Sequence, residues 1–265
     1  MTIKTFHNAI ILALCLITFR IEASTQTDHL LQEAYNSYVA GEKATTISDR
    51  KKAFNLSLSI YTELEKIDQP TFGNGKLYYN IGNSYFQLEE YPWAILYYNK
   101  ALKLNPRNDA IQQNLTTAQQ KAGLSSATFL SLYDQVFFFH TKLALPERLQ
   151  LFFAFGMIVL VVISTWIWHP QRWQKSTLVL FGICSLIMFC SVCYTRYFSP
   201  IEGVIVESTP LYRDAGKQYA TASELPILSG NKIRVLVILE NGQWLKVMAP
   251  NGDLGYVPHT AIRII

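Results

Sequence analysis

The sequence is poor in the residues that build redox and metal sites. It has four cysteines and five histidines in 265 residues. No two histidines stand at metal-ligand spacing, and the cysteines all lie in apolar stretches, at Cys15, Cys184, Cys190 and Cys193. We therefore expect no structural disulfide, no metal site and no cofactor in the polar parts of the chain. The C-S-V-C pair at Cys190 and Cys193 leaves a redox role open, although small packing residues are the simpler interpretation.

Motifs of catalysis are also missing. The G-x-S-x-G element of hydrolases is absent, and Gly75-Lys76 lacks the earlier glycine of a phosphate-binding loop. No polar part of the chain contains a cysteine that could act as a nucleophile. We predict a protein that is not an enzyme, with no catalytic and no metal-ligating residue.

Neither polar part of the chain has an excess of one charge. The net charge is +4, but residues 24–124 carry ten basic and ten acidic residues, and residues 199–265 carry six of each. The positive surplus therefore lies in the apolar stretches and their flanks. This balance argues against nucleic-acid binding, which needs a basic surface.

Two long apolar runs dominate the chain. The first, Leu149 to Trp168, has no charge in 20 residues. As a helix it covers about 30 Å, the hydrocarbon thickness of a bilayer. The second runs from Thr177 to Tyr194, and aromatic residues at both ends fit the two membrane interfaces. We predict transmembrane helices at 149–168 and 176–197 joined by a loop at 169–175. Two buried helices of a soluble domain are the alternative.

Residues 1–23 have the pattern of a signal peptide. Lys4 precedes an apolar stretch from Ala9 to Phe19, which is too short to cross a bilayer comfortably, and Ala23 offers a small residue for cleavage. An uncleaved anchor is the alternative. Either interpretation places both polar parts of the chain on the exported side of a bacterial inner membrane, and the loop at 169–175 in the cytoplasm.

Residues 24–124 are helical in pattern, and their most informative part is 75–108. Aromatic, small and proline residues recur there at fixed positions: Tyr78, Ile81, Gly82, Tyr85, Ala94, Tyr98, Ala101 and Pro106. This spacing resembles the tetratricopeptide repeat, in which two helices cross closely at small residues. The resemblance implies an all-α domain with Gly82 and Ala94 at the crossing, and Pro106 ending the second helix.

One repeat cannot bury both of its faces, so neighbouring helices are required. Leu30 to Val39 and Ala53 to Leu64 resemble the helices of a degenerate repeat, separated by a polar connection from Gly41 to Arg50. Asp109 to Lys121 begins in the right register and then becomes polar, as a capping helix does. We predict roughly two repeats and a cap.

If the repeat folds as its family does, its concave face carries polar and aromatic side chains. We predict that this face holds a partner's extended segment. The residues are Lys76, Tyr79, Asn80, Asn83, Phe86, Gln87, Gln113 and Thr117. A solvated polar face without a partner is the alternative for each of them.

Residues 125–148 mix phenylalanines and leucines with Asp134, His140 and Lys142, and Pro146 precedes the first apolar run. This mixture suggests an amphipathic segment that lies in the membrane interface. We expect it to couple the repeats to the hairpin.

Beyond Pro200 the pattern changes to short strands and turns. Lys232 to Leu239 is rich in β-branched residues, and Asn-Gly pairs at 241–242 and 251–252 predict tight turns on either side of Trp244 to Met248. With the Gly255-Tyr256-Val257 element, these segments resemble the bacterial SH3-like barrel. The resemblance implies an all-β domain at 200–265.

The same resemblance implies a groove in this domain that holds a peptide or peptidoglycan. Its candidate residues are Tyr212, Trp244, Tyr256 and Pro258. The alternative for Trp244 is a place in the interior of the barrel.

The order of the parts, from signal peptide through repeats and hairpin to SH3-like domain, resembles the BatE-type proteins of the bacterial Bat (aerotolerance operon) family. The resemblance implies a non-enzymatic inner-membrane scaffold linked to oxidative-stress tolerance or envelope maintenance. Its expected partners are membrane-anchored von Willebrand A-domain proteins and other Bat proteins. The alternative is an envelope protein that binds peptidoglycan and recruits cell-wall enzymes.

Overall fold

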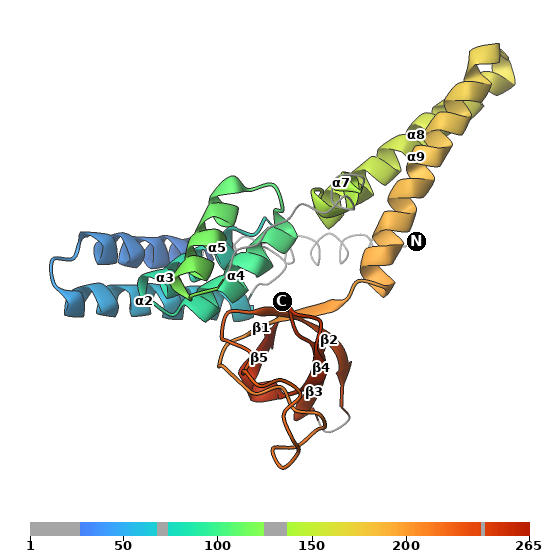
Figure 1. The fold of residues 1–265 in the computed structure, drawn as a ribbon. Helices are drawn as coiled ribbons and strands as arrows, with labels where there is room; N and C mark the ends of the chain where they lie inside the picture. Colours follow the sequence, from blue (N-terminus) through green and yellow to red (C-terminus); the bar gives the residue numbers. More distant parts are fainter. Residues whose placement is uncertain (1–26, 68–73, 125–136, 240–241) are drawn as a thin grey trace, which may run out of the picture. The chain divides into compact units, whose positions relative to one another are not determined.

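The computed structural model of the protein describes residues 27–67, 74–124, 137–239 and 242–265 (Figure 1). The chain divides into two compact units, one ending at Glu90 and the other running from Tyr91 to Ile265. Each unit is described by itself. The predicted signal peptide lies outside the described residues, as does the predicted interfacial segment up to residue 136.

The first unit is helical. A helix over residues 27–43 is followed by α2 (Ile47–Ile67) and α3 (Lys76–Gln87). Thr46 caps α2, because its Oγ1 accepts a hydrogen bond from the backbone N–H of Asp49 at 3.1 Å. The core contains large side chains that recur at helical spacing: Phe54, Tyr61, Leu64, Leu77 and Ile81. The buried Ser57 hydroxyl donates to the carbonyl of Ala34 at 2.9 Å and joins α2 to the first helix.

The predicted polar connection from Gly41 to Arg50 is wrong. The first helix continues through Gly41 to residue 43, and only residues 44–46 lie between the helices. Gly41 is buried against Phe54, and a Cβ placed there would lie 2.8 Å from the phenyl ring. The glycine therefore allows a close approach of two helices instead of breaking one.

The second unit begins with α4 (Tyr91–Leu104) and α5 (Asp109–Lys121), which pack together. Ala94, Tyr98 and Ala101 on α4 are buried, as expected for the second helix of the repeat. Asn108 caps α5 by accepting a hydrogen bond from the backbone N–H of Ile111 at 3.2 Å. The predicted capping helix is therefore present in the predicted range.

Two long apolar helices follow the short α7 (Phe138–Thr141). They are α8 (Leu145–Trp168) and α9 (Arg172–Tyr197), which lie side by side as an antiparallel hairpin (Figure 1). Both are long and apolar enough to cross a membrane. Only 6% and 11% of their most apolar stretches are buried, which disfavours the alternative of a soluble core.

The helix α8 begins before the predicted span, because Pro146 fits its first turn, where no backbone N–H is needed. Glu147 caps this turn, its Oε2 accepting from the N–H of Ala144 at 2.8 Å. In the described part of the predicted interfacial segment, the only other helix is the four-residue α7.

The C-terminal part of the second unit is an antiparallel sheet. Its strands are β1 (Ile201–Ile205), β2 (Lys232–Ile238), β3 (Trp244–Met248), β4 (Leu254–Pro258) and β5 (Ile262–Ile264). Alternate side chains such as Val235, Leu245, Val247 and Val257 form its core. Gly252, with φ at +90°, makes the turn from β3 to β4.

The strand order is β4-β3-β2-β1-β5, and β4 and β5 stand at opposite ends. Figure 1 shows the sheet curving strongly. The strand pairings in the described residues nevertheless do not close it into the predicted barrel, since β4 pairs along its length with β3 alone and β5 with β1 alone. The short 3₁₀ turn His259–Ala261 carries the chain from one edge to the other.

Replacing Gly41 by alanine should destabilise the first unit by about 1–3 kcal/mol, because the new methyl group overlaps the buried Phe54 ring. Thermal unfolding of the full chain measures the effect. Gly182→Ala is the control, since a Cβ at that helical position meets nothing within 4 Å. Equal melting temperatures for Gly41→Ala and the unaltered protein would contradict the proposed close packing.

Tyr61 makes the first unit sensitive to alkali. Burial of its side chain, which is 1% exposed, raises the pKa of Tyr61 to about 12, and a hydrogen bond with Asn80 partly offsets this rise. The unfolded chain ionises this group near pH 10. The neutral hydroxyl therefore makes its full contribution to the free energy of unfolding below pH 10. That free energy falls by about 2–3 kcal/mol as the pH rises from about 10 to 12.

Tyr61→Phe should reduce this alkaline loss of stability, measured by denaturant unfolding at several pH values. Part of the loss should remain, because burial also raises the pKa of Tyr85 to about 12. The control Tyr219→Phe changes a tyrosine that is 45% exposed and plays no part in the raised pKa of Tyr61, so it should leave the loss as it is. The same slope in both variants would refute the role of Tyr61.

Candidate functional site

The predicted partner-binding residues of α3 lie along one side of the helix. Lys76, Asn80, Asn83 and Gln87 recur every three or four residues, which places them on one face. Tyr79 and Phe86 flank this stripe. Lys76 is exposed, and the other five are half-buried, so the face can be reached by a partner.

Two amides on this face are already hydrogen-bonded within the first unit. Gln87 Oε1 accepts from Arg50 Nη2 at 3.3 Å, and Gln87 Nε2 donates to the hydroxyl of Tyr38 at 3.4 Å. Asn80 is held by the buried Tyr61. A partner would therefore meet amides whose orientation is set before binding.

Arg50 was missed by the sequence reasoning, which placed it in the polar connection. It lies in the first turn of α2, with its guanidinium 5.8 Å from the centre of the Phe54 ring. Thirty-seven residues separate it from Gln87. The one local signal is its position four residues before an aromatic side chain, which permits a cation–π contact on a helix.

Gln113 and Thr117 lie in the second unit, on the exposed face of α5. Thr117 Oγ1 donates to the carbonyl of Gln113 at 2.9 Å, so this hydroxyl serves its own helix. Ile111 and Ala118 are buried on the other side. Both residues are therefore exposed on α5.

The four predicted residues of the sheet groove come together on its outer face. Strand pairing sets Trp244 opposite Pro258 and Lys246 opposite Tyr256. Tyr212 joins Tyr256 by two backbone hydrogen bonds of 2.9 and 2.7 Å. Its ring meets that of Trp244 edge to face, with 5.5 Å between centroids.

Trp244 does not fill the interior of the sheet. Leu245 and Val247, its neighbours on β3, point into the core and are fully buried, whereas Trp244 is half-buried on the opposite face. Lys246 shares that face and lies 5.8 Å from the centre of the Tyr256 ring. The result is an aromatic surface beside the Lys246 ammonium.

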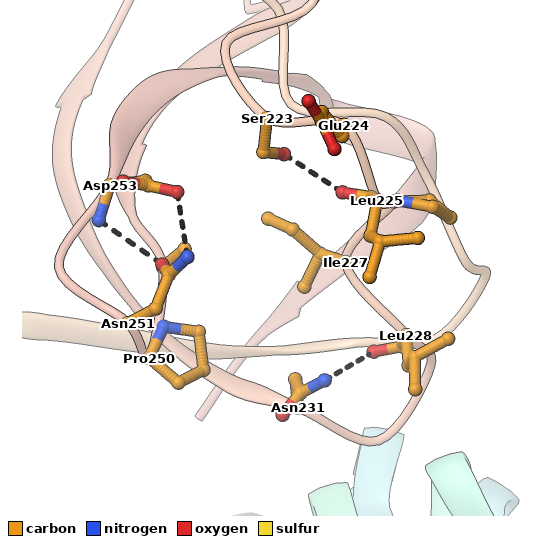
Figure 2. Close-up of a pocket in the computed structure, with 11 residues that line it drawn as sticks. Ser223, Glu224, Leu225, Ile227, Leu228, Asn231, Pro250, Asn251 and Asp253 are labelled. Atoms are coloured by element: carbon orange, nitrogen blue, oxygen red, sulfur yellow. Dashed lines mark hydrogen bonds between the residues drawn. The ribbon is translucent and has the colours of Figure 1, made fainter.

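A second hollow in this region was not predicted. Figure 2 shows it between the segment 223–231 and the turn 249–253. Its volume is about 510 Å³, and Glu224 and Asp253 are its charged lining residues. Asn251 fixes Asp253 by donating to its carboxylate at 2.6 Å.

The sequence signal for this hollow was a pair of leucines in the loop that lines it. Leu225 is 80% exposed and Leu228 is 49% exposed, on either side of the buried Ile227. The loop therefore leaves two apolar side chains exposed beside the hollow.

No group of three histidine, cysteine, aspartate or glutamate side chains that could hold a metal occurs among the residues that the structure describes. The candidate sites instead consist of amides, aromatic rings, exposed leucines and single charged groups such as Lys76, Glu224 and Asp253. This chemistry supports binding.

Residues 75–108 match the tetratricopeptide repeat family. The match covers α3, α4 and their connection, which is the range predicted for the best repeat. A search of curated proteins found no match to the chain. The chain therefore contains a tetratricopeptide repeat, and such repeats commonly mediate protein–protein interactions.

Proposed function

We propose that this chain is a non-enzymatic membrane scaffold that binds protein partners through its repeat region. The observation that carries the proposal is the tetratricopeptide repeat at 75–108, with its face of oriented amides on α3. The hairpin of α8 and α9 anchors the scaffold in the bacterial inner membrane. The proposal concerns binding because the described surfaces offer recognition groups.

The antiparallel hairpin supports placing the repeat and the sheet on one side of the membrane, since a chain that crosses twice returns to the side it left. The signal-like pattern of residues 1–23 makes that side the exported one. Resemblance to the BatE-type proteins suggests a complex with von Willebrand A-domain and other Bat proteins. It also suggests the link to oxidative-stress tolerance or envelope maintenance.

Two binding surfaces held at one membrane would reinforce each other. The α3 face would hold an extended segment of a partner, and the aromatic face around Trp244, an SH3-like surface, would hold a second peptide. Joining two weak sites in one chain raises their combined affinity by about 10² to 10⁴ when both can be engaged together.

The aromatic face also favours a second function. Half-buried, edge-to-face rings such as those of Tyr212 and Trp244 can pack against sugar rings as well as peptides. In this alternative the sheet binds peptidoglycan and the repeats recruit cell-wall enzymes.

Lys76→Glu should weaken recovery of the protein partners by at least about fivefold, because it reverses an exposed charge on the binding face. Quantitative copurification from membranes measures the recovery. Lys52→Glu makes the same charge change at an exposed position of α2 and serves as the control. Equal recovery with both variants would refute binding through the α3 face.

Trp244→Ala separates the two functions. If the sheet binds peptidoglycan, this variant should lose sedimentation with isolated wall sacculi by about fivefold, and Tyr219→Ala, an exposed residue outside the aromatic face, should not. If the sheet binds a protein partner, the unaltered chain should not sediment with sacculi at all.

Topology is tested with single cysteines at Lys51, Lys175 and Lys217, all exposed, in a chain without the native four cysteines. A maleimide that cannot cross the inner membrane is added to cells whose outer membrane has been permeabilised. It should label positions 51 and 217 but not 175. Labelling of position 175 alone would reverse the proposed orientation.

A further inference from the structure

Arg148 is a buried cation at one end of the hairpin. It lies in α8, and its side chain is 5% exposed. One nitrogen, Nη1, makes all its hydrogen bonds: to Thr195 Oγ1 at 2.8 Å, Ser191 Oγ at 3.0 Å, the Ser191 carbonyl at 3.3 Å and His140 Nδ1 at 3.0 Å. These partners lie on α9 and α7.

Every one of these partners is uncharged. His140 accepts through Nδ1, which requires the neutral ring, and burial together with the nearby Arg148 lowers the pKa of His140. No carboxylate stands within ion-pairing distance of Arg148 in the described part of the chain. The neighbouring Glu147 instead caps α8 and pairs with Arg107. A buried guanidinium without a counter-charge is costly and points to a missing anion.

The Nε and Nη2 edge of the Arg148 guanidinium has no partner among the described residues. Arg148 Nε is buried and makes no hydrogen bond, and Nη2 makes none with the described residues. The Nε and Nη2 edge is the one that binds two oxygens of a carboxylate or phosphate side by side.

A second partnerless donor lies in the same place. The hydroxyl of Thr141 is buried without a hydrogen bond. Thr141, Arg148 and the half-buried Lys142 line one cavity together. Glu202 lines it as well, but its carboxylate is paired with Lys232 at 2.7 Å. Two unpaired donors and a second cation around one hollow form a site for an oxyanion.

The position of the site in the hairpin indicates which oxyanion it takes. Arg148 is in the first turns of α8, and Ser191 and Thr195 are in the last turns of α9. In a membrane-inserted hairpin, this end lies at the depth of the lipid headgroups. Phosphate groups of phospholipids are abundant at that depth.

We infer that Arg148, Thr141 and Lys142 bind the phosphate of an anionic phospholipid at the exported end of the hairpin. The inference rests on the proposed membrane insertion of α8 and α9. An anionic lipid is selected because Arg148 and Lys142 supply two positive charges, whereas a zwitterionic lipid brings an ammonium of its own. The lipid would join α7 to the hairpin.

The test is native mass spectrometry of the full chain in neutral detergent, titrated with phosphatidylglycerol. Arg148→Lys keeps the positive charge but loses the paired Nε and Nη2 donors. It should therefore bind this lipid at least about fivefold more weakly. Thr141→Val keeps every charge and should also weaken binding. Arg196→Lys is the matched control, an exposed arginine at the same end of α9, and should bind as the unaltered protein does.

Two further arms identify the source of the phosphate. Excess inorganic phosphate should not displace the lipid, and phosphatidylethanolamine should bind more weakly than phosphatidylglycerol. Displacement by inorganic phosphate, or equal binding of the two lipids, would overturn the assignment to an anionic lipid. Unchanged binding by Arg148→Lys, or an equal loss in Arg196→Lys, would overturn the site itself.

Alkaline carbonate extraction of membranes distinguishes failure of the lipid site from failure of the proposed membrane insertion. A chain extracted into the soluble fraction would show that the hairpin is not inserted. A chain retained in the membrane whose Arg148→Lys variant binds phosphatidylglycerol normally would overturn the lipid site alone. The helix content of each variant, from circular dichroism, shows whether the hairpin is folded.

Discussion

The exposed apolar surface of α8 and α9 is the main physical constraint on this protein. The functions that we propose for the repeat and the sheet both require this surface to lie in a membrane. The backbone polar groups of a helix are hydrogen-bonded to one another. A helix is therefore one of the few structures that are stable in the hydrocarbon core of a bilayer. The two helices contact each other through aromatic pairs, Phe152 with Phe189 at 5.7 Å and Phe155 with Phe181 at 5.8 Å between centroids. Most of their remaining apolar surface faces outward, and in our proposal it faces lipid.

Polar side chains fix how the two helices meet. At the loop end, Gln174 Nε2 donates to Thr165 Oγ1 at 3.3 Å, and Gln174 is 2% exposed. At the other end, Arg148 reaches Ser191 and Thr195. Apolar faces alone allow helices to slide and rotate, whereas directional hydrogen bonds select one register. The hydrogen bonds that orient Arg148 also leave its second edge unpaired, which connects the hairpin's packing to the proposed lipid site.

The two proposed recognition surfaces share a physical feature, which is orientation before binding. Gln87 is held by Arg50 and Tyr38, and the Trp244 ring is held against Tyr212. Side chains already ordered in the free protein lose less conformational entropy when a partner arrives. Modest affinities at each surface then suffice, provided that the hairpin keeps both at one membrane.

Local patterns in the sequence determined most of the elements. The strands β3 and β4 were predictable because Leu245 and Val247 alternate with outward residues, and Asn-Gly pairs mark their turns. The repeat was predictable because its small and aromatic residues recur at fixed spacing. The apolar runs of α8 and α9 were visible for the same reason, since each signal lies within a few turns of chain.

Contacts between distant residues were decided by the tertiary structure alone. Gly41 continues a helix because Phe54 packs against it, and Gln87 is fixed by residues 37 and 49 positions away. Among the described residues, the strand pairings place β4 and β5 at opposite edges of the sheet. Arg148 acquires its partners from positions 43 and 47 residues further along. A sequence pattern reports the preference of each segment, but burial and hydrogen bonding depend on which segments the fold brings together.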